Sequence, residues 1–123
     1  MLPITYHQPY LTLRQTLTQS QLFIAAETVD LKLLRASLQA IKTQFQQQIL
    51  SLDLDAVDPT VGLKLQSIQT EISKQLRLLE VDLLFLQTAR QSATVQQRYT
   101  QISDRLTMLI RYCEMVLGTE EES

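Results

Sequence analysis

Residues 65–90 have the sequence LQSIQTEISKQLRLLEVDLLFLQTAR. An α-helix turns by about 100° per residue, so apolar residues that recur every three or four positions share one side of it. Uninterrupted spacing of this kind is typical of a helix that packs lengthwise against other helices. The apolar stripe of this stretch consists of Leu65, Ile68, Ile72, Leu76, Leu79, Leu83, Leu86 and the stem of Arg90.

Three further stretches carry the same spacing, which predicts an all-α, antiparallel up-down-up-down four-helix bundle. We expect one domain, residues 1–118, with helices at about 6–26, 30–52, 59–90 and 95–117 and a disordered acidic tail at 119–123. The other three stripes are Tyr6, Tyr10, Leu13, Leu17, Ser20 and Ile24; Leu31, Leu34, Leu38, Ile41, Phe45, Ile49 and Leu52; and Val95, Tyr99, Ile102, Leu106, Leu109, Cys113, Val116 and Leu117.

Capping residues set the predicted ends of these helices. Thr5 is the expected cap of the first helix, and Pro9 is tolerated in a first turn, where an early N–H has no partner. Asp58, which precedes a proline, is a strong start for the third helix. Thr94 is the expected cap of the fourth helix, and Gly118 is suited to end it in a left-handed conformation.

The boundary at residues 27–30 is open to two interpretations. The apolar spacing runs through it without a gap, which would fit one helix from Thr5 to Leu52. We favour a break, because Thr28 or Asp30 can cap a new helix. A single helix of about 47 residues would also extend roughly 70 Å and outreach its partners.

Composition excludes several function classes. The chain has 11 basic and 13 acidic residues, and they are mixed along its length. This balance argues against binding to nucleic acid or to an acidic membrane surface. No uninterrupted apolar segment reaches about 18 residues, so no membrane insertion is expected. The N-terminus lacks the pattern of a signal peptide and the single cysteine cannot form an internal disulfide, so a cytoplasmic protein is expected.

The polar residues offer little chemistry. The only histidine, His7, lies near the start of the first helix, which disfavours a phosphotransfer site, and none of the four stripes contains an acid. Asp53, Asp55 and Asp58 lack the glycine and closing glutamate of a calcium loop, so we interpret them as helix-terminal residues. Cys113 is expected in the core. The sequence therefore predicts that the chain is not an enzyme and uses no cofactor and no metal.

Function is thus expected to lie on the surface. The 65–90 helix carries a second apolar set away from its main stripe, and the last helix carries a basic flank with methionine and tyrosine, residue types that are enriched at interfaces. Cover by a neighbouring element is the alternative for the first set. For the two arginines of that basic flank, Arg98 and Arg105, the alternative is pairing with acidic residues on the third helix. The predicted partner surface comprises Leu78, Val81, Leu84, Phe85, Arg98, Arg105, Met108 and Tyr112.

Five stretches in order along the chain also resemble a known family. They resemble the cyanobacterial heterocyst-frequency-control proteins of the PatD type. The likeness covers nearly the whole chain and is strongest between residues 46 and 117. The stretches are QQQILSLD at 46–53, KQLRLL at 74–79, DLLFLQTAR at 82–90, QISDRL at 101–106 and IRYC at 110–113.

The resemblance implies a small cytoplasmic helical protein without catalytic activity. It implies an adaptor that binds the tubulin-like division protein FtsZ, promotes its assembly and so influences cell size and heterocyst frequency. No FtsZ-binding motif is carried over from the family, so the surface residues above remain an inference from this sequence. The alternative is a self-associating helical scaffold, such as a homodimer, with an unrelated protein partner.

Overall fold

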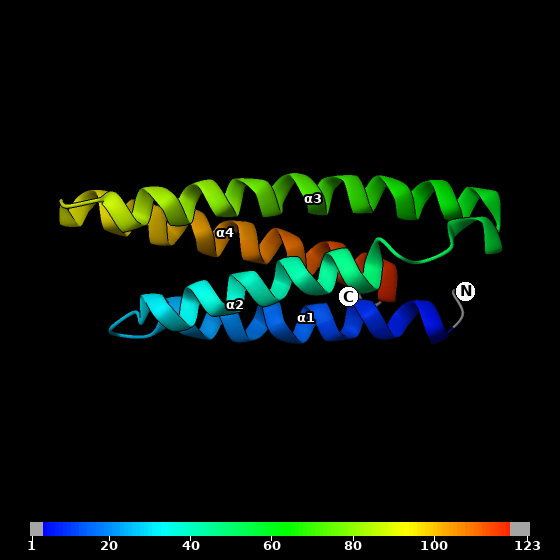
Figure 1. The fold of residues 1–123 in the computed structure, drawn as a ribbon, viewed down its shortest axis with the longest axis horizontal. Helices are drawn as coiled ribbons and strands as arrows, with labels where there is room; N and C mark the ends of the chain where they lie inside the picture. The colour runs from blue at the N-terminus through cyan, green and yellow to red at the C-terminus, as the bar shows by residue number, and fades with distance from the viewer. Residues whose placement is uncertain (1–3, 119–123) are drawn as a thin grey trace.

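The computed structural model describes residues 4–118, and these form a bundle of four α-helices. The helices are α1 (Ile4–Ala25), α2 (Leu31–Gln44), α3 (Pro59–Thr88) and α4 (Ser92–Leu117). In Figure 1, successive helices run in opposite directions, and the α1–α2 hairpin lies beside the α3–α4 hairpin. The all-α four-helix bundle is therefore confirmed. The predicted acidic tail at 119–123 lies outside the described residues.

The predicted apolar stripes form the interior. All six stripe residues of α1 are buried, and so are the middle residues of the α4 stripe, from Ile102 to Val116. The α3 stripe is buried except for Leu83, which is partly covered, and Arg90, which is exposed because α3 already ends at Thr88. Burial of large aliphatic side chains is the main term that stabilises such a bundle. Among the described helices, none has both the length and the apolar character needed to cross a membrane.

The break between the first two helices is confirmed. Helix α1 ends at Ala25, and α2 begins at Leu31 after a short connection. The carboxylate of Asp30 accepts hydrogen bonds from the backbone N–H groups of Lys32, at 3.0 Å, and Leu33, at 3.2 Å. These bonds satisfy N–H groups that have no partner inside the helix, so one continuous first helix is excluded.

The start of α1 differs from the prediction. The helix already includes Ile4, so Thr5 is a helical residue and not the cap. Pro9 consequently lies inside the helix, where its missing N–H cannot bond to the carbonyl of Thr5. Thr5 is exposed, so solvent can satisfy this carbonyl at the end of the bundle.

The second helix was predicted to continue to residue 52, but α2 ends at Gln44 in a π-helical turn, Phe45–Ile49. The N–H of Leu50 donates to the carbonyl of Phe45, five residues back, at 2.9 Å. Such a turn is wider than an α-helical one. In an α-helix, residues four apart do not point in quite the same direction, so a stripe with this spacing gradually turns away from the core. The wider turn compensates for this rotation, and Phe45 and Ile49 are both buried. The carbonyl of Ile49 accepts from the N–H of Leu52 at 3.1 Å and from the Gln69 amide at 3.2 Å.

The remaining helix ends are partly as predicted. The carboxylate of Asp58 caps α3 by accepting from the N–H of Thr60 at 2.9 Å, and Gly118 ends α4 with φ 78°. Thr94 does not cap α4, because the helix begins earlier, at Ser92, with Gln91 in an extended conformation before it. Serine and alanine are adequate helix formers, so nothing at Ser92 prevents the earlier start.

The four interfaces between neighbouring helices are not equally close. Helix α1 packs extensively on α2 and α4, and α3 packs on α4, whereas α2 and α3 touch only sparsely. Two small residues, Ser20 and Ser37, let α1 and α2 approach, and their hydroxyls are hydrogen-bonded to each other inside the bundle. The bundle therefore has three closed interfaces and one that is more open.

Two tyrosines of α1 offer a matched pair of hydroxyls. The Tyr6 hydroxyl donates to the carbonyl of Asp53 at 2.6 Å, whereas the buried Tyr10 hydroxyl has no hydrogen-bond partner among residues 4–118. Tyr6→Phe should lower the free energy of unfolding by about 0.5–1.5 kcal/mol, the usual net value of one hydrogen bond. Tyr10→Phe should leave it unchanged or raise it, because a buried hydroxyl without a partner is unfavourable. Urea denaturation of both variants checks this, and a larger loss for Tyr10→Phe would contradict it.

Candidate interaction surface

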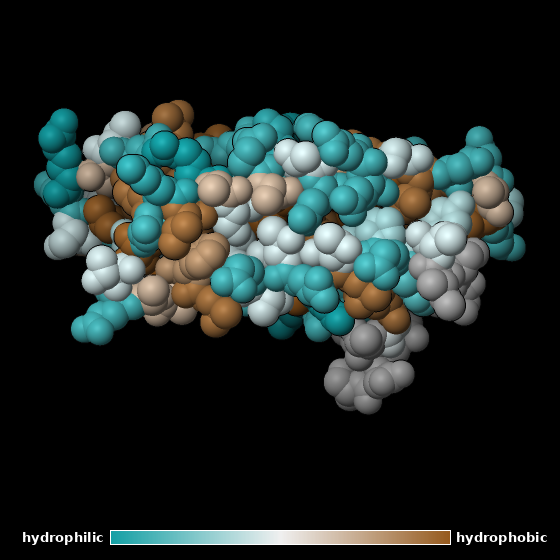
Figure 2. Space-filling model, turned by 60° about the horizontal axis from the view of Figure 1, so that its bottom comes forward, coloured by the Kyte–Doolittle hydropathy of each residue, from teal (hydrophilic) through white to brown (hydrophobic). Residues whose placement is uncertain are grey.

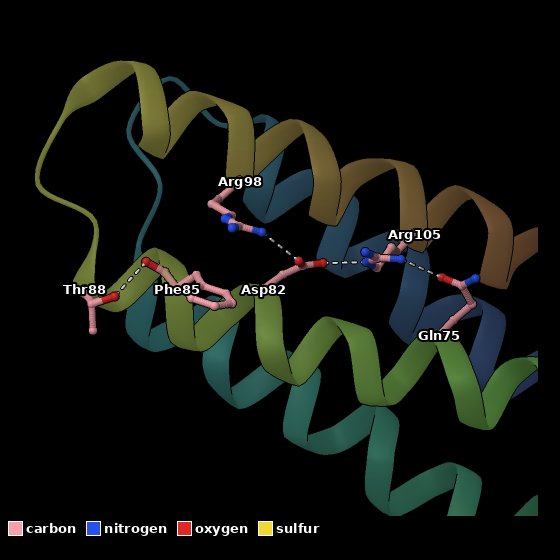
Figure 3. A network of polar contacts seen from close by, with 6 residues as sticks. All are labelled: Gln75, Asp82, Phe85, Thr88, Arg98 and Arg105. Carbon is pink, nitrogen blue, oxygen red and sulfur yellow. Dashed lines mark hydrogen bonds and ion pairs between the residues drawn. The ribbon is translucent and has the colours of Figure 1, made fainter.

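A buried carboxylate joins α3 to α4. Asp82 is 2% exposed, and its Oδ2 lies 2.5 Å from Nε of Arg105. Its Oδ1 lies 3.4 Å from Nη1 of Arg98 (Figure 3). The four predicted stripes contain no acid, and Asp82 is a buried acid that lies outside them. Asp82 lies beside the apolar stripe of α3, on the side that α4 covers, so its burial depends on how the two helices pack.

Arg105 is part of the inter-helix packing and is not free for a partner. Its Nη1 also donates to Oε1 of buried Gln75 at 3.3 Å, and its side chain is 17% exposed. A guanidinium held by a carboxylate and an amide is fixed in orientation. The alternative left open for the two arginines, pairing with an acid on the third helix, is thus observed for both.

Arg98 connects the ion pair to the surface. Its side chain is 32% exposed, and its guanidinium carbon lies 4.5 Å from the centroid of the Phe85 ring. A cation over an aromatic face is attracted by the ring quadrupole. Figure 3 shows Arg98 on α4 directed toward Asp82 and Phe85 on α3. The two predicted surfaces are therefore adjacent, and Arg98 joins them.

The predicted surface residues divide into two groups. Leu78 and Tyr112 are half-buried, and Tyr112 packs against the core, with the pKa of its phenol raised by burial and by nearby Glu71. Exposed apolar side chains remain at Met108 on α4 and at three positions on α3. We call these three positions the α3 outer patch, and they are Val81, Leu84 and Phe85.

A second region of exposed apolar side chains was not predicted. Figure 2 shows hydrophobic side chains gathered toward the end of the molecule that carries the α1–α2 connection. Leu22 on α1 and Leu33 on α2 are exposed, and each lies a few residues from that connection in the sequence. An open hollow of about 640 Å³ lies nearby, between the connection and α4, with Val29 and Tyr99 in its wall. Its mixed polar and apolar lining gives no pattern of charges for a specific ligand.

The residues that might have carried chemistry have structural roles. The carboxylate of Asp53 accepts from the N–H of Asp55 at 3.0 Å and so caps a 3₁₀ turn, Leu54–Ala56. Cys113 is buried as predicted, and burial raises the pKa of its thiol to about 12. A thiol with this pKa stays protonated near neutral pH and is a poor nucleophile. Residues 4–118 hold no group of three or more acids, histidines or cysteines placed to bind a metal ion.

The buried thiol predicts a loss of stability at alkaline pH. The pKa of Cys113 rises from about 9 to about 12 in the folded protein, so its contribution is complete below pH 9 and lost as the pH rises toward 12. Between pH 7 and pH 10 the linkage relation gives a loss on the order of 1 kcal/mol. Urea unfolding at the two pH values should show this loss in the wild type and a correspondingly smaller one in Cys113→Ala. Equal losses in the two proteins would contradict the assignment.

No protein-family model matches the chain, and neither a curated protein nor a solved structure matches it. The likeness to the PatD-type family therefore rests on the five stretches quoted above. Two of them, at 82–90 and 101–106, contain Asp82 and Arg105, the closest ion pair between α3 and α4.

Proposed function

We propose that this chain is a non-catalytic cytoplasmic adaptor that binds the tubulin-like division protein FtsZ and promotes its assembly. Through that assembly it influences cell size and heterocyst frequency in cyanobacteria. The identity of the partner is supported by the resemblance of the five stretches to the PatD-type proteins. The manner of action, through an exposed surface, is supported by the geometry of α3 and α4.

The observation that carries this proposal is the α3 outer patch. Its three apolar residues are exposed on a helix whose other side is fixed in the core. Exposed apolar groups that adjoin a fixed cation are typical of protein–protein contacts. Because Arg98 is already held by Asp82 and Phe85, little side-chain entropy is lost when a partner covers it.

Promotion of assembly requires contact with two protomers or self-association of the adaptor. A rigid bundle suits this role, since it would hold two such contacts at a fixed spacing. Within residues 4–118, Cys113 is buried and protonated and Asp82 is paired with two arginines, so neither side chain is available as a reactive group.

Sedimentation of purified FtsZ tests the proposal. FtsZ with GTP is centrifuged with and without the chain, and FtsZ with GDP serves as the control that cannot polymerise. We expect more FtsZ in the pellet when the chain is present with GTP, and we expect the chain to pellet with it. No co-pelleting and no change in polymer mass would reject binding to FtsZ.

A self-associating scaffold with an unrelated partner is the second candidate, and the same exposed patch favours it. In that case the α3 outer patch would close a dimer. Light scattering of the wild type and of Leu84→Asp, a change at an exposed position, separates the candidates. A wild-type dimer that becomes a monomer in the variant supports the scaffold, and a monomer in both samples rejects it.

A further inference from the structure

The more open α2–α3 interface forms a groove. Three hollows of about 70, 240 and 510 Å³ lie along it. The first and second share Lys42, Leu76 and Glu80 in their walls. The second and third share Leu50 and Arg77. Neighbouring hollows share wall residues and therefore adjoin one another, and we call the row of three the α2–α3 groove. The ion pair of Lys42 with Glu80 joins α2 to α3 between the first two hollows.

The floor of the groove is apolar in its first two hollows, whereas the third is lined by polar side chains apart from Leu50. Leu38 and Phe45 from α2 and its π-helical turn face Leu76, Leu79 and Leu83 from α3. Along α3 the groove extends from Gln66 to Leu83, which is about 25 Å at 1.5 Å per residue. Each hollow contains at least one apolar side chain, from Leu83 at one end to Leu50 at the other, which suits the apolar face of a helix of similar length.

The rim of the groove is basic, although the whole chain is acidic. Four of the residues that line it are cationic and one, Glu80, is acidic, which gives a formal charge of +3 in a chain of net charge −2. Glu80 is itself neutralised by Lys42, with the nitrogen and oxygen 2.7 Å apart. Lys74 and Arg77 are exposed and belong to none of the ion pairs formed within residues 4–118. The groove therefore presents apolar side chains beside uncompensated positive charge.

We propose that the α2–α3 groove is a docking site for an acidic amphipathic helix of a partner protein. The apolar face of that helix would cover Leu38, Leu83 and the exposed Leu50, and its carboxylates would lie against Lys74 and Arg77. This site lies on the α2 side of α3, away from the side where Asp82 meets α4. The inference goes beyond the proposed function, because it holds whichever protein supplies the helix. Two separate contact surfaces would also allow one molecule to bridge two partners.

The test uses a fluorescently labelled helical peptide of about 18 residues, matched to the length of the groove. The peptide has leucines at helical spacing on one face and glutamates on the other. A second peptide has lysines in place of the glutamates. Fluorescence anisotropy at low ionic strength should show saturable binding of the acidic peptide only, and added salt should weaken it.

Two double charge reversals locate the site. Lys74→Glu/Arg77→Glu should weaken binding of the acidic peptide by about tenfold or more, since like charges then face each other. Lys64→Glu/Arg111→Glu changes the net charge equally at exposed positions outside the groove and should change affinity by less than about threefold. All four side chains are exposed, so both variants should fold, and circular dichroism checks this.

Several outcomes would overturn the assignment. The assignment fails if the acidic peptide shows no saturable binding, or if the basic peptide binds equally well. It also fails if the two double charge reversals weaken binding of the acidic peptide equally. A wild-type dimer that only Lys74→Glu/Arg77→Glu dissociates would show that a second copy fills the groove instead. No FtsZ is present in these measurements, so their failure is distinct from a failure of the proposed function.

Discussion

Replacement of Asp82 by alanine is expected to lower the free energy of unfolding by about 3 kcal/mol, near the lower end of the range for breaking a buried ion pair. The change leaves Arg98 and Arg105 facing each other between α3 and α4 without their shared carboxylate. The loss should not reach the top of that range, because Arg98 is partly exposed and water can solvate it. Urea denaturation monitored by circular dichroism measures the change.

Asp104→Ala is the matched control for Asp82→Ala. Asp104 is an exposed acid on α4 and takes part in none of the ion pairs formed within residues 4–118. Its removal should alter the free energy of unfolding by less than about 0.5 kcal/mol, as is usual for surface positions. If Asp82→Ala cost no more than this control, the carboxylate would be a bystander and not the link between α3 and α4.

Leu79→Ala and Leu106→Ala should each lower the free energy of unfolding by about 2–5 kcal/mol. Both leucines are buried in the core, Leu79 on α3 and Leu106 on α4, so truncation removes apolar contacts and leaves a cavity. Leu63→Ala is the control, because this leucine of α3 is 69% exposed. Denaturant titrations of the three variants compare them directly. A loss below about 0.5 kcal/mol at both core positions would mean that the assigned core is misplaced.

Most of the fold could be predicted because it depends on local spacing. The stripe from Tyr6 to Ile24 is buried in full, and the capping residues Asp30 and Asp58 have the roles expected for them. These features depend on neighbours within four residues in the sequence, which helical periodicity and capping preferences describe well. The π-helical turn at Phe45 was missed, since a spacing of four is compatible with an ordinary helix as well.

The site could be predicted only in part, because its key contacts are distant in sequence. Asp82 meets Arg98 and Arg105, which lie 16 and 23 residues further along the chain. Asp82 belongs to none of the predicted stripes, and periodicity cannot say which flank of α3 is covered by α4. One signal was available, since Arg98 and Arg105 are seven residues apart and therefore share one side of their helix. A lone acid in the apolar run at 81–86 was their natural partner.

Two exposed leucines of α3 show why the sequence alone could not locate the exposed apolar patch. Leu63 and Leu84 are both highly exposed, at 69% and 60%, yet only Leu84 adjoins other exposed apolar side chains and the Arg98–Phe85 contact. Hydrophobicity along the chain does not distinguish them. The arrangement of α4 on α3 does, and it places the α3 outer patch at one end of the helix.

The central claim, that this molecule acts through the α3 outer patch and not through its interior, is tested most directly by FtsZ sedimentation with two variants. Leu84→Asp and Leu63→Asp introduce the same charge at exposed positions of the same helix. We expect the wild type and Leu63→Asp to increase the FtsZ that pellets with GTP, and Leu84→Asp, correctly folded, to leave it at the level of FtsZ alone. Full activity of Leu84→Asp in this assay would contradict the claim.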